Sequence, residues 1–141
     1  MSFTLPKPAP DDCRGALHPQ AVVGIKLFNQ GHYWHAHEAL ETAWMEESGE
    51  VRHLYRGVLQ IAVAYLHVTR HNYPGVVKVY QRSQRWLDPF PDLCRGLHLG
   101  RLRQDAAAVM AEVLRLGPDH LNEFDLSLLK PVVWDEPAEA I

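Results

Sequence analysis

The sequence has no long hydrophobic run, few cysteines and little imbalance of charge, and each absence excludes a class of protein. Of its 141 residues 47% are hydrophobic, yet the longest apolar run, residues 61–66, is far shorter than the ~20 residues of a membrane span. Two cysteines, Cys13 and Cys94, are too few for a disulfide scaffold, so we expect reduced thiols. The net charge is −3, so nucleic acid is not an expected partner.

Three further signals are missing. No segment alternates between apolar and polar residues for long enough to predict a β-sheet. No glycine-rich stretch carries the Lys and Ser/Thr of a phosphate-binding loop. The first ten residues hold three prolines and no apolar core of a signal peptide. We therefore expect a cytoplasmic protein that does not enter the membrane.

Helical periodicity dominates what is present, and it predicts an all-α fold with a single compact array of about five helices. Proline at the first turn and glycine after the last turn are typical helix boundaries. The short Gly49 connection predicts that the second and third helices form an antiparallel pair. The expected helices cover residues 19–30, 32–48, 50–71, 74–87 and 99–116. We expect an extended arm (1–18), a helical domain (19–117) and a C-terminal tail that docks on it (118–141).

Polar residues cluster on the facing sides of the second and third helices. At about 100° per residue, His37 and Glu41 share a face with Leu40 and Trp44, which we expect in the core. We expect this His/Glu pair to be largely buried and hydrogen-bonded between the two helices. The candidate catalytic residues are His37, Glu38, Glu41, Gln60 and His67. The candidate binding residues are Tyr33, Arg52, His53 and Arg56.

Imidazole and carboxylate groups are metal ligands as well as proton-transfer groups. The zinc motif His-Glu-x-x-His is not present, because Glu41 stands where its second histidine would be. A positive charge at Arg56 would repel a cation and pair with Glu41 or Glu38. We therefore expect no metal ion and no cofactor.

Two groups of motifs resemble a known family. The first half is Phe28-Asn29, Gly31, Tyr33, His37-Glu38, Leu40-Glu41 and Trp44. The second half is Gly49, Arg52, Gly57, Gln60, Ala62, Ala64, His67 and Gly75. Over about residues 22–87 this chain is similar to domain-of-unknown-function family 309, a family of small helical bacterial and archaeal proteins. The resemblance implies about five helices and implies no established activity.

Two functional hypotheses remain open. The first is a binding or scaffold module with a buried His/Glu/Gln/Arg network, whose partner would be a protein or a second copy of the chain. The second is a small metal-dependent or acid/base enzyme of hydrolase type that uses the candidate catalytic residues. Six basic residues also lie within 26 positions, and we interpret them as a solvated face. They are Lys78, Arg82, Arg85, Arg95, Arg101 and Arg103.

Overall fold

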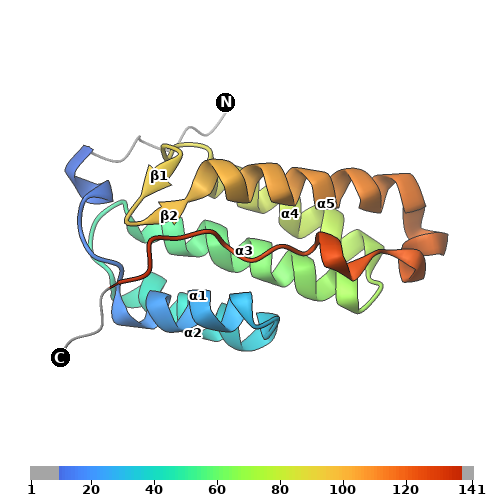
Figure 1. The fold of residues 1–141 in the computed structure, drawn as a ribbon, viewed down its shortest axis with the longest axis horizontal. Helices are drawn as coiled ribbons and strands as arrows, with labels where there is room; N and C mark the ends of the chain where they lie inside the picture. The colour runs from blue at the N-terminus through green and yellow to red at the C-terminus, as the bar shows by residue number, and fades with distance from the viewer. Residues whose placement is uncertain (1–9, 138–141) are drawn as a thin grey trace.

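Five α-helices make up most of the computed structural model, which describes residues 10–137 (Figure 1). They are α1 (Pro19–Asn29), α2 (Tyr33–Glu46), α3 (Arg52–Thr69), α4 (Tyr73–Leu87) and α5 (Leu99–His120). Short 3-10 helices precede α1 (η1, Pro10–Cys13) and follow α5 (η2, Leu121–Glu123; η3, Leu126–Leu128). The all-α prediction is confirmed, and the predicted helix ends lie within a few residues of the observed ones.

Local sequence signals explain where several helices begin. Pro19 and Pro74 lie in the first turns of α1 and α4, where a missing N–H costs no helical hydrogen bond. The His18 ring accepts a hydrogen bond from the Gln20 N–H, and the Asn72 side chain accepts one from the Gly75 N–H. These side chains satisfy backbone donors that the first helical turn leaves without partners.

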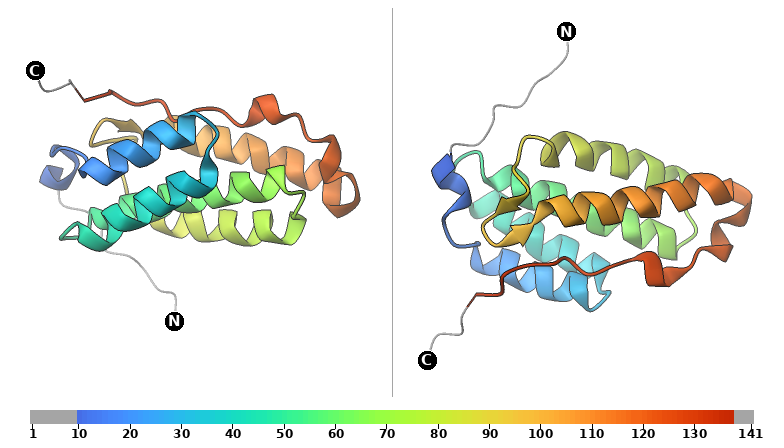
Figure 2. Two further views of the ribbon diagram at one scale, coloured as in Figure 1. Left: turned by 90° about the horizontal axis from the view of Figure 1, so that it is seen from below. Right: turned by 45° about the horizontal axis from the view of Figure 1, so that its top comes forward.

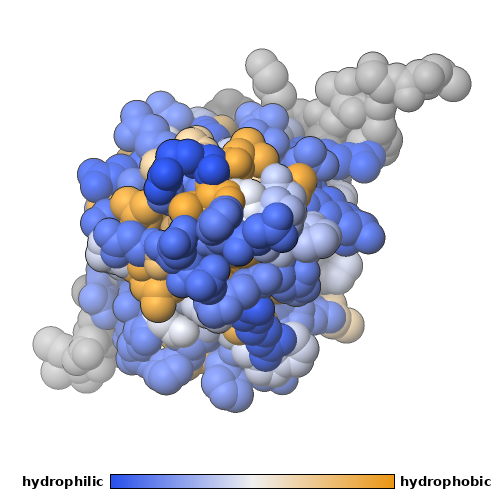
Figure 3. Space-filling model, turned by 90° about the vertical axis from the view of Figure 1, so that its right-hand side faces the viewer, coloured by the Kyte–Doolittle hydropathy of each residue, from blue (hydrophilic) through white to orange (hydrophobic). Residues whose placement is uncertain are grey.

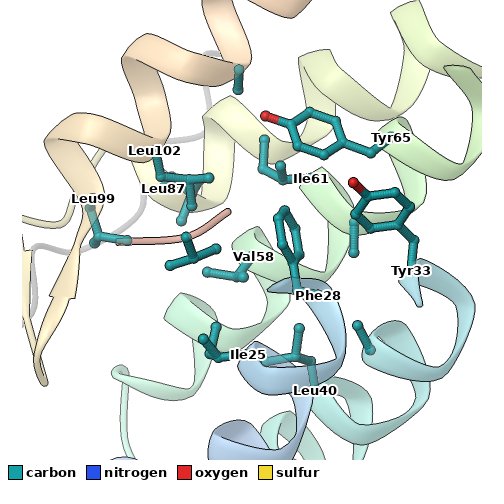
Figure 4. Close-up of a cluster of buried hydrophobic side chains, with 14 of the residues drawn as sticks. Ile25, Phe28, Tyr33, Leu40, Val58, Ile61, Tyr65, Leu87, Leu99 and Leu102 are labelled. Atoms are coloured by element: carbon teal, nitrogen blue, oxygen red, sulfur yellow. The ribbon is translucent and has the colours of Figure 1, made fainter. Parts of the chain in front are cut away.

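The helices follow one another as packed neighbours. α1 packs on α2, α2 on α3, and α3 on α4, which confirms the predicted packing of α2 against α3 (Figure 2). α5 then runs along the bundle beside α4. The core lies between these helices, where the rings of Phe28, Tyr33 and Tyr65 meet at centroid distances of 5.3 to 5.7 Å (Figure 4). Tyr33 is therefore a core residue.

A small β-hairpin lies between α4 and α5, although the sequence predicted no sheet. Strand β1 (Leu93–Cys94) pairs antiparallel with β2 (Leu97–His98). The two turn residues, Arg95 and Gly96, have φ angles of 51° and 82°, which are typical of the tight hairpin turn that requires positive φ at both positions. Strands of two residues are too short to produce a visible alternation, so the periodicity could not reveal them.

The two cysteines form a disulfide, so the expectation of reduced thiols is wrong for this structure. Cys13 and Cys94 are bonded with a Cα–Cα distance of 4.3 Å, although 81 positions separate them in the chain. The Arg95 N–H donates to the Cys13 carbonyl at 2.8 Å. This backbone contact brings η1 beside the hairpin, so distance along the chain was a poor guide to distance in space.

The chain after α5 returns along the bundle to the hairpin (Figure 1). α5 is interrupted at Gly117, whose φ of 70° and ψ of −179° are not helical. The Asn29 side chain accepts a hydrogen bond from the Val132 N–H at 2.7 Å and donates to the Val132 carbonyl at 3.1 Å. Leu97 and Trp134 then form an antiparallel bridge. This docking covers Val132, which is 2% exposed.

The end of the molecule that carries the turn after α5 shows only small apolar patches, divided by hydrophilic side chains (Figure 3). Within residues 10–137, no helix has the length and apolar character required to cross a membrane.

Candidate functional site

A hollow of about 200 Å³ opens between α2 and α3. Both helices contribute side chains to its wall, and most of these side chains are polar. The lining residues are His37, Glu41, Trp44, Arg56, Leu59 and Gln60. The hollow is smaller than the ~300–1,000 Å³ of a site for a drug-sized ligand, so it suits a small molecule.

Arg56 lies between two tryptophans from neighbouring helices. Its guanidinium carbon is 4.8 Å from the ring centroid of Trp44 on α2 and 4.2 Å from that of Trp86 on α4. These are cation–π distances. Within residues 10–137, the guanidinium makes no hydrogen bond and no ion pair, so its N–H groups are available to a ligand. The predicted pairing of Arg56 with Glu41 or Glu38 is therefore wrong.

The electrostatics around Arg56 favour the binding of an anion. Burial lowers the pKa of Arg56, and the positive charge of nearby Arg85 lowers it further. Both effects disfavour the charged form, and no carboxylate of the described chain offsets them. An anion bound in the hollow would restore this balance. Arginine is well suited to such an anion, because its planar fork of donors matches a carboxylate.

Buried polar atoms without partners concentrate around the hollow. Among the described residues five such atoms occur, and three of them belong to residues that line it: His37 Nδ1, Trp44 Nε1 and Gln60 Oε1. A fourth, His53 Nδ1, belongs to a ring that stacks on Trp86 at 4.9 Å. Buried polar groups almost always have partners, so this cluster indicates a site that is incomplete without a ligand or ordered water.

His37 and Glu41 lie at the rim of the hollow. His37 Nε2 is 3.4 Å from Glu41 Oε2, and the two side chains are 21% and 47% exposed. The expectation that both are largely buried is correct for His37 and wrong for Glu41. Their contact also runs along α2 and does not reach across to α3. A buried network that fixes the register of the two helices is therefore not what the side chains form here.

Two of the candidate catalytic residues lie away from the hollow. Glu38 is exposed and pairs with His35 at 3.2 Å. His67 shares the α3 face with Gln60 but follows it by seven residues, about 10 Å along the helix axis, and its Nδ1 contacts Asn72 Nδ2 at 3.1 Å. The structure thus brings together His37, Glu41 and Gln60 only, because a shared helical face does not guarantee a shared height.

The candidate binding residues of α3 fall in different places. Arg52 is exposed outside the hollow. His53 stacks on Trp86, and burial lowers its pKa, an effect that the charges of Arg52 and Arg56 reinforce and that of Glu50 opposes. Its imidazole is therefore biased towards the neutral form beside the hollow.

No three His, Cys, Asp or Glu side chains within residues 10–137 are grouped so that they could hold a metal ion. The chemistry that the hollow offers is recognition by a guanidinium, an amide, an indole N–H and the His37–Glu41 pair.

A second hollow of about 180 Å³ lies between α3, α4 and α5. Most of its polar side chains are already bonded within the fold. Arg103 donates to the carbonyls of Leu87 and Phe90 at the end of α4, and Ser83 donates to the Tyr80 carbonyl. We therefore interpret this second hollow as a gap in the packing of α5.

The predicted solvated face of basic residues is divided by the fold. Arg95 is directed inward to Glu47, Arg101 pairs with Asp105 across one turn, and Arg103 bonds the end of α4. These three arginines are therefore occupied by intramolecular partners.

Sequence reasoning missed the contribution of Trp86 to the site. Helical periodicity had no means of placing Trp86, on the fourth helix, over Arg56. The signal that could have found it is the close approach of α4 to α3, where an added Cβ at Gly57 would lie 2.5 Å from Leu87 Cδ2. A glycine at this position indicates that the two helices are in close contact near Leu87. Trp86 precedes Leu87 in the chain, so it lies at the same contact.

Part of the chain is similar to known proteins. A curated relative from Aquifex aeolicus (strain VF5), described as an uncharacterized protein, is 31% identical over 88 residues, which is 62% of this chain and 25% of the relative. The match thus spans about a quarter of that protein. The family model for a domain of unknown function, DUF309, covers α2 and α3 entirely. Residues 22–79 of this chain match the DUF309 family model, which agrees with the resemblance of the sequence motifs, and the hollow's α2 and α3 residues lie within the matched segment.

Proposed function

We propose that this chain is a binding module that takes a small carboxylate-bearing molecule in the hollow between α2 and α3. The observation that carries the proposal is Arg56, whose guanidinium lies between Trp44 and Trp86 without an anionic partner in the described chain. The two rings restrict the guanidinium plane, so little side-chain entropy is lost when a carboxylate binds.

The polar wall supports the same function. Trp44 Nε1 can only donate a hydrogen bond, and Gln60 can donate or accept. Among the described residues, the buried atoms Trp44 Nε1 and Gln60 Oε1 have no hydrogen-bond partner. A ligand that places its carboxylate on Arg56 and a second polar group beside it would give these buried atoms hydrogen-bond partners. A buried polar atom without a partner otherwise costs about 1–3 kcal/mol.

A titration with propionate followed by ¹H–¹⁵N NMR tests the proposal. Propionate is a simple carboxylate that fits the hollow. We expect the indole N–H signal of Trp44, identified by its loss in Trp44→Phe, to shift in a saturable manner in the millimolar range. Arg56→Gln should abolish the shift, because it removes the charge and the fork of donors.

Arg70→Gln is the matched control. Arg70 is exposed at the C-terminal end of the same helix, so its loss changes the net charge equally and leaves the hollow intact. Equal binding by Arg56→Gln and the parent protein would contradict the proposal, and so would a Trp44 signal that propionate does not move.

The acid/base enzyme is the second candidate, and it depends on the 3.4 Å contact between His37 and Glu41 at the rim. A histidine beside a carboxylate is a proton-transfer pair. This function would use His37, Glu41 and Gln60 and would dispense with Glu38 and His67. Hydrolysis of a carboxylic ester by the parent protein and not by His37→Gln would favour it over binding alone.

The cytoplasm is the proposed location. Its thiol reductants act on disulfides such as Cys13–Cys94, so the state of the two cysteines in the cell tests it. Rapid alkylation at lysis followed by mass measurement determines this state, and two modified thiols would support a cytoplasmic location. An unmodified, fully oxidised protein would contradict a cytoplasmic location.

A further inference from the structure

Two opposite charges line the hollow without meeting. Arg56 on α3 and Glu41 on α2 both belong to its wall, yet they form no ion pair with each other. Among the described residues Glu41 pairs only with His37 at the rim, and Arg56 pairs with no carboxylate. Charges of opposite sign that share a small site normally close on each other unless packing holds them apart. Here the stack of Arg56 between Trp44 and Trp86 holds the guanidinium in place.

The space between the charges has the size of a very small metabolite. The hollow of about 200 Å³ corresponds to about six or seven water volumes. That is room for a carboxylate, an amino group and a short side chain. It is too little for a nucleotide or a peptide of several residues.

The neutral polar groups fit a ligand that donates as well as accepts hydrogen bonds. Gln60 Oε1 is an acceptor without a partner. When His37 Nε2 carries its proton towards Glu41, His37 Nδ1 is a second acceptor without a partner. A simple carboxylate offers no donor to these acceptors. An ammonium group offers three donors.

We propose that the ligand of the hollow is a small free α-amino acid, bound as its zwitterion. Its carboxylate lies on the Arg56 guanidinium, and its ammonium group lies towards Glu41 with Gln60 Oε1 as the neutral acceptor. This inference rests on the proposed carboxylate-binding function and adds the second charge of the ligand. Phosphate is disfavoured, because Glu41 repels a second negative charge and the wall holds one arginine.

Three probes that share an ethyl skeleton test the carboxylate and the ammonium group of the ligand separately: L-alanine, propionate and ethylamine. Each is titrated against the full chain, and the Trp44 indole signal reports occupancy. We expect L-alanine to bind about tenfold more tightly than propionate, the gain of one charge-assisted hydrogen bond at a half-exposed carboxylate. Ethylamine alone should bind more weakly than either.

Glu41→Gln tests the contact with the ammonium group of the ligand. Glu38→Gln is its control, because Glu38 lies on the same helix and its carboxylate pairs with His35 outside the hollow. In Glu41→Gln we expect most of the tenfold preference for L-alanine over propionate to be lost, because only the neutral acceptors remain for the ammonium group. In Glu38→Gln the tenfold preference should persist.

The outcomes distinguish this inference from the function on which it rests. Equal binding of L-alanine and propionate to the parent protein overturns the zwitterion and leaves carboxylate binding standing. A tenfold preference for L-alanine that survives Glu41→Gln undiminished also overturns it. A Trp44 signal that neither probe moves overturns carboxylate binding itself.

Discussion

Replacement of Arg95 should destabilise the protein more than any other single surface arginine, because this side chain joins three distant segments. Its Nε donates to the Asp12 carbonyl at 2.7 Å, and its Nη1 donates to the Ala16 carbonyl at 2.8 Å. Nη1 also bonds the carboxylate of Glu47 and lies 3.3 Å from the Tyr55 hydroxyl. The side chains of Arg95 and Glu47 are 14% and 20% exposed.

The magnitude follows from this burial. Arg95→Ala leaves the Glu47 carboxylate without its cation, and loss of one partner of a buried pair costs about 3–5 kcal/mol. Arg95→Gly loses the same bonds, but Arg95 has a φ of 51°. Glycine adopts that conformation without the ~1–2 kcal/mol penalty of a side chain, so Arg95→Gly should be about 1 kcal/mol more stable than Arg95→Ala.

Urea unfolding followed by circular dichroism, without reductant so that the disulfide is kept, measures both effects at constant m. Arg101→Ala is the control: Arg101 is 57% exposed and, among the described residues, pairs only with Asp105, so its loss should change stability by less than about 0.5 kcal/mol. A loss below about 1 kcal/mol in Arg95→Ala, or an Arg95→Gly variant less stable than Arg95→Ala, would refute the reasoning.

Three other substitutions test the fold around the site. Asn29→Ala removes both hydrogen bonds to Val132, so it should lower the free energy of unfolding by about 1–3 kcal/mol and speed amide exchange at Val132. Unchanged exchange would show that the C-terminal segment docks by other means. Gly57→Ala places a Cβ 2.5 Å from Leu87 Cδ2, so overpacking of about 1–3 kcal/mol should outweigh the ~1 kcal/mol gain in helix propensity, and a higher melting temperature would contradict this. Burial lowers the pKa of His53 in the folded state. Between that pKa and about 6.5 the unfolded chain therefore binds more protons, and the free energy of unfolding falls as the pH drops through this window. His53→Phe should flatten this dependence of stability on pH, and an unchanged dependence would assign it to another group.

Much of the fold could be predicted because its signals are local. Proline at residue 19 marks the start of α1, and glycine at residue 117 marks the interruption of α5. Both act through backbone constraints that extend over only a few residues. The hairpin and the disulfide could not be predicted in the same way. They depend on the contact between Cys13 and Arg95, which lie in segments far apart in the chain.

The site was predicted in part for a similar reason. Periodicity correctly set His37, Glu41 and Gln60 towards one region, since it fixes the angle of a side chain around its helix. It does not fix the height at which two helices cross, so His67 was assigned to a region that it does not reach. It also gives no account of competing partners, and two tryptophan rings hold the Arg56 side chain that was expected to pair with Glu41.

The Nε–H signal of Arg56 during a propionate titration is the most direct measurement of carboxylate binding in the hollow. It is assigned by its loss in Arg56→Gln and observes the guanidinium itself. If Arg56 holds the ligand, this signal moves downfield and saturates together with the Trp44 indole signal, as a charge-assisted hydrogen bond forms. If the Arg56 signal stays in place at saturating propionate while signals elsewhere move, the carboxylate binds at another site and the proposed function of the hollow is wrong.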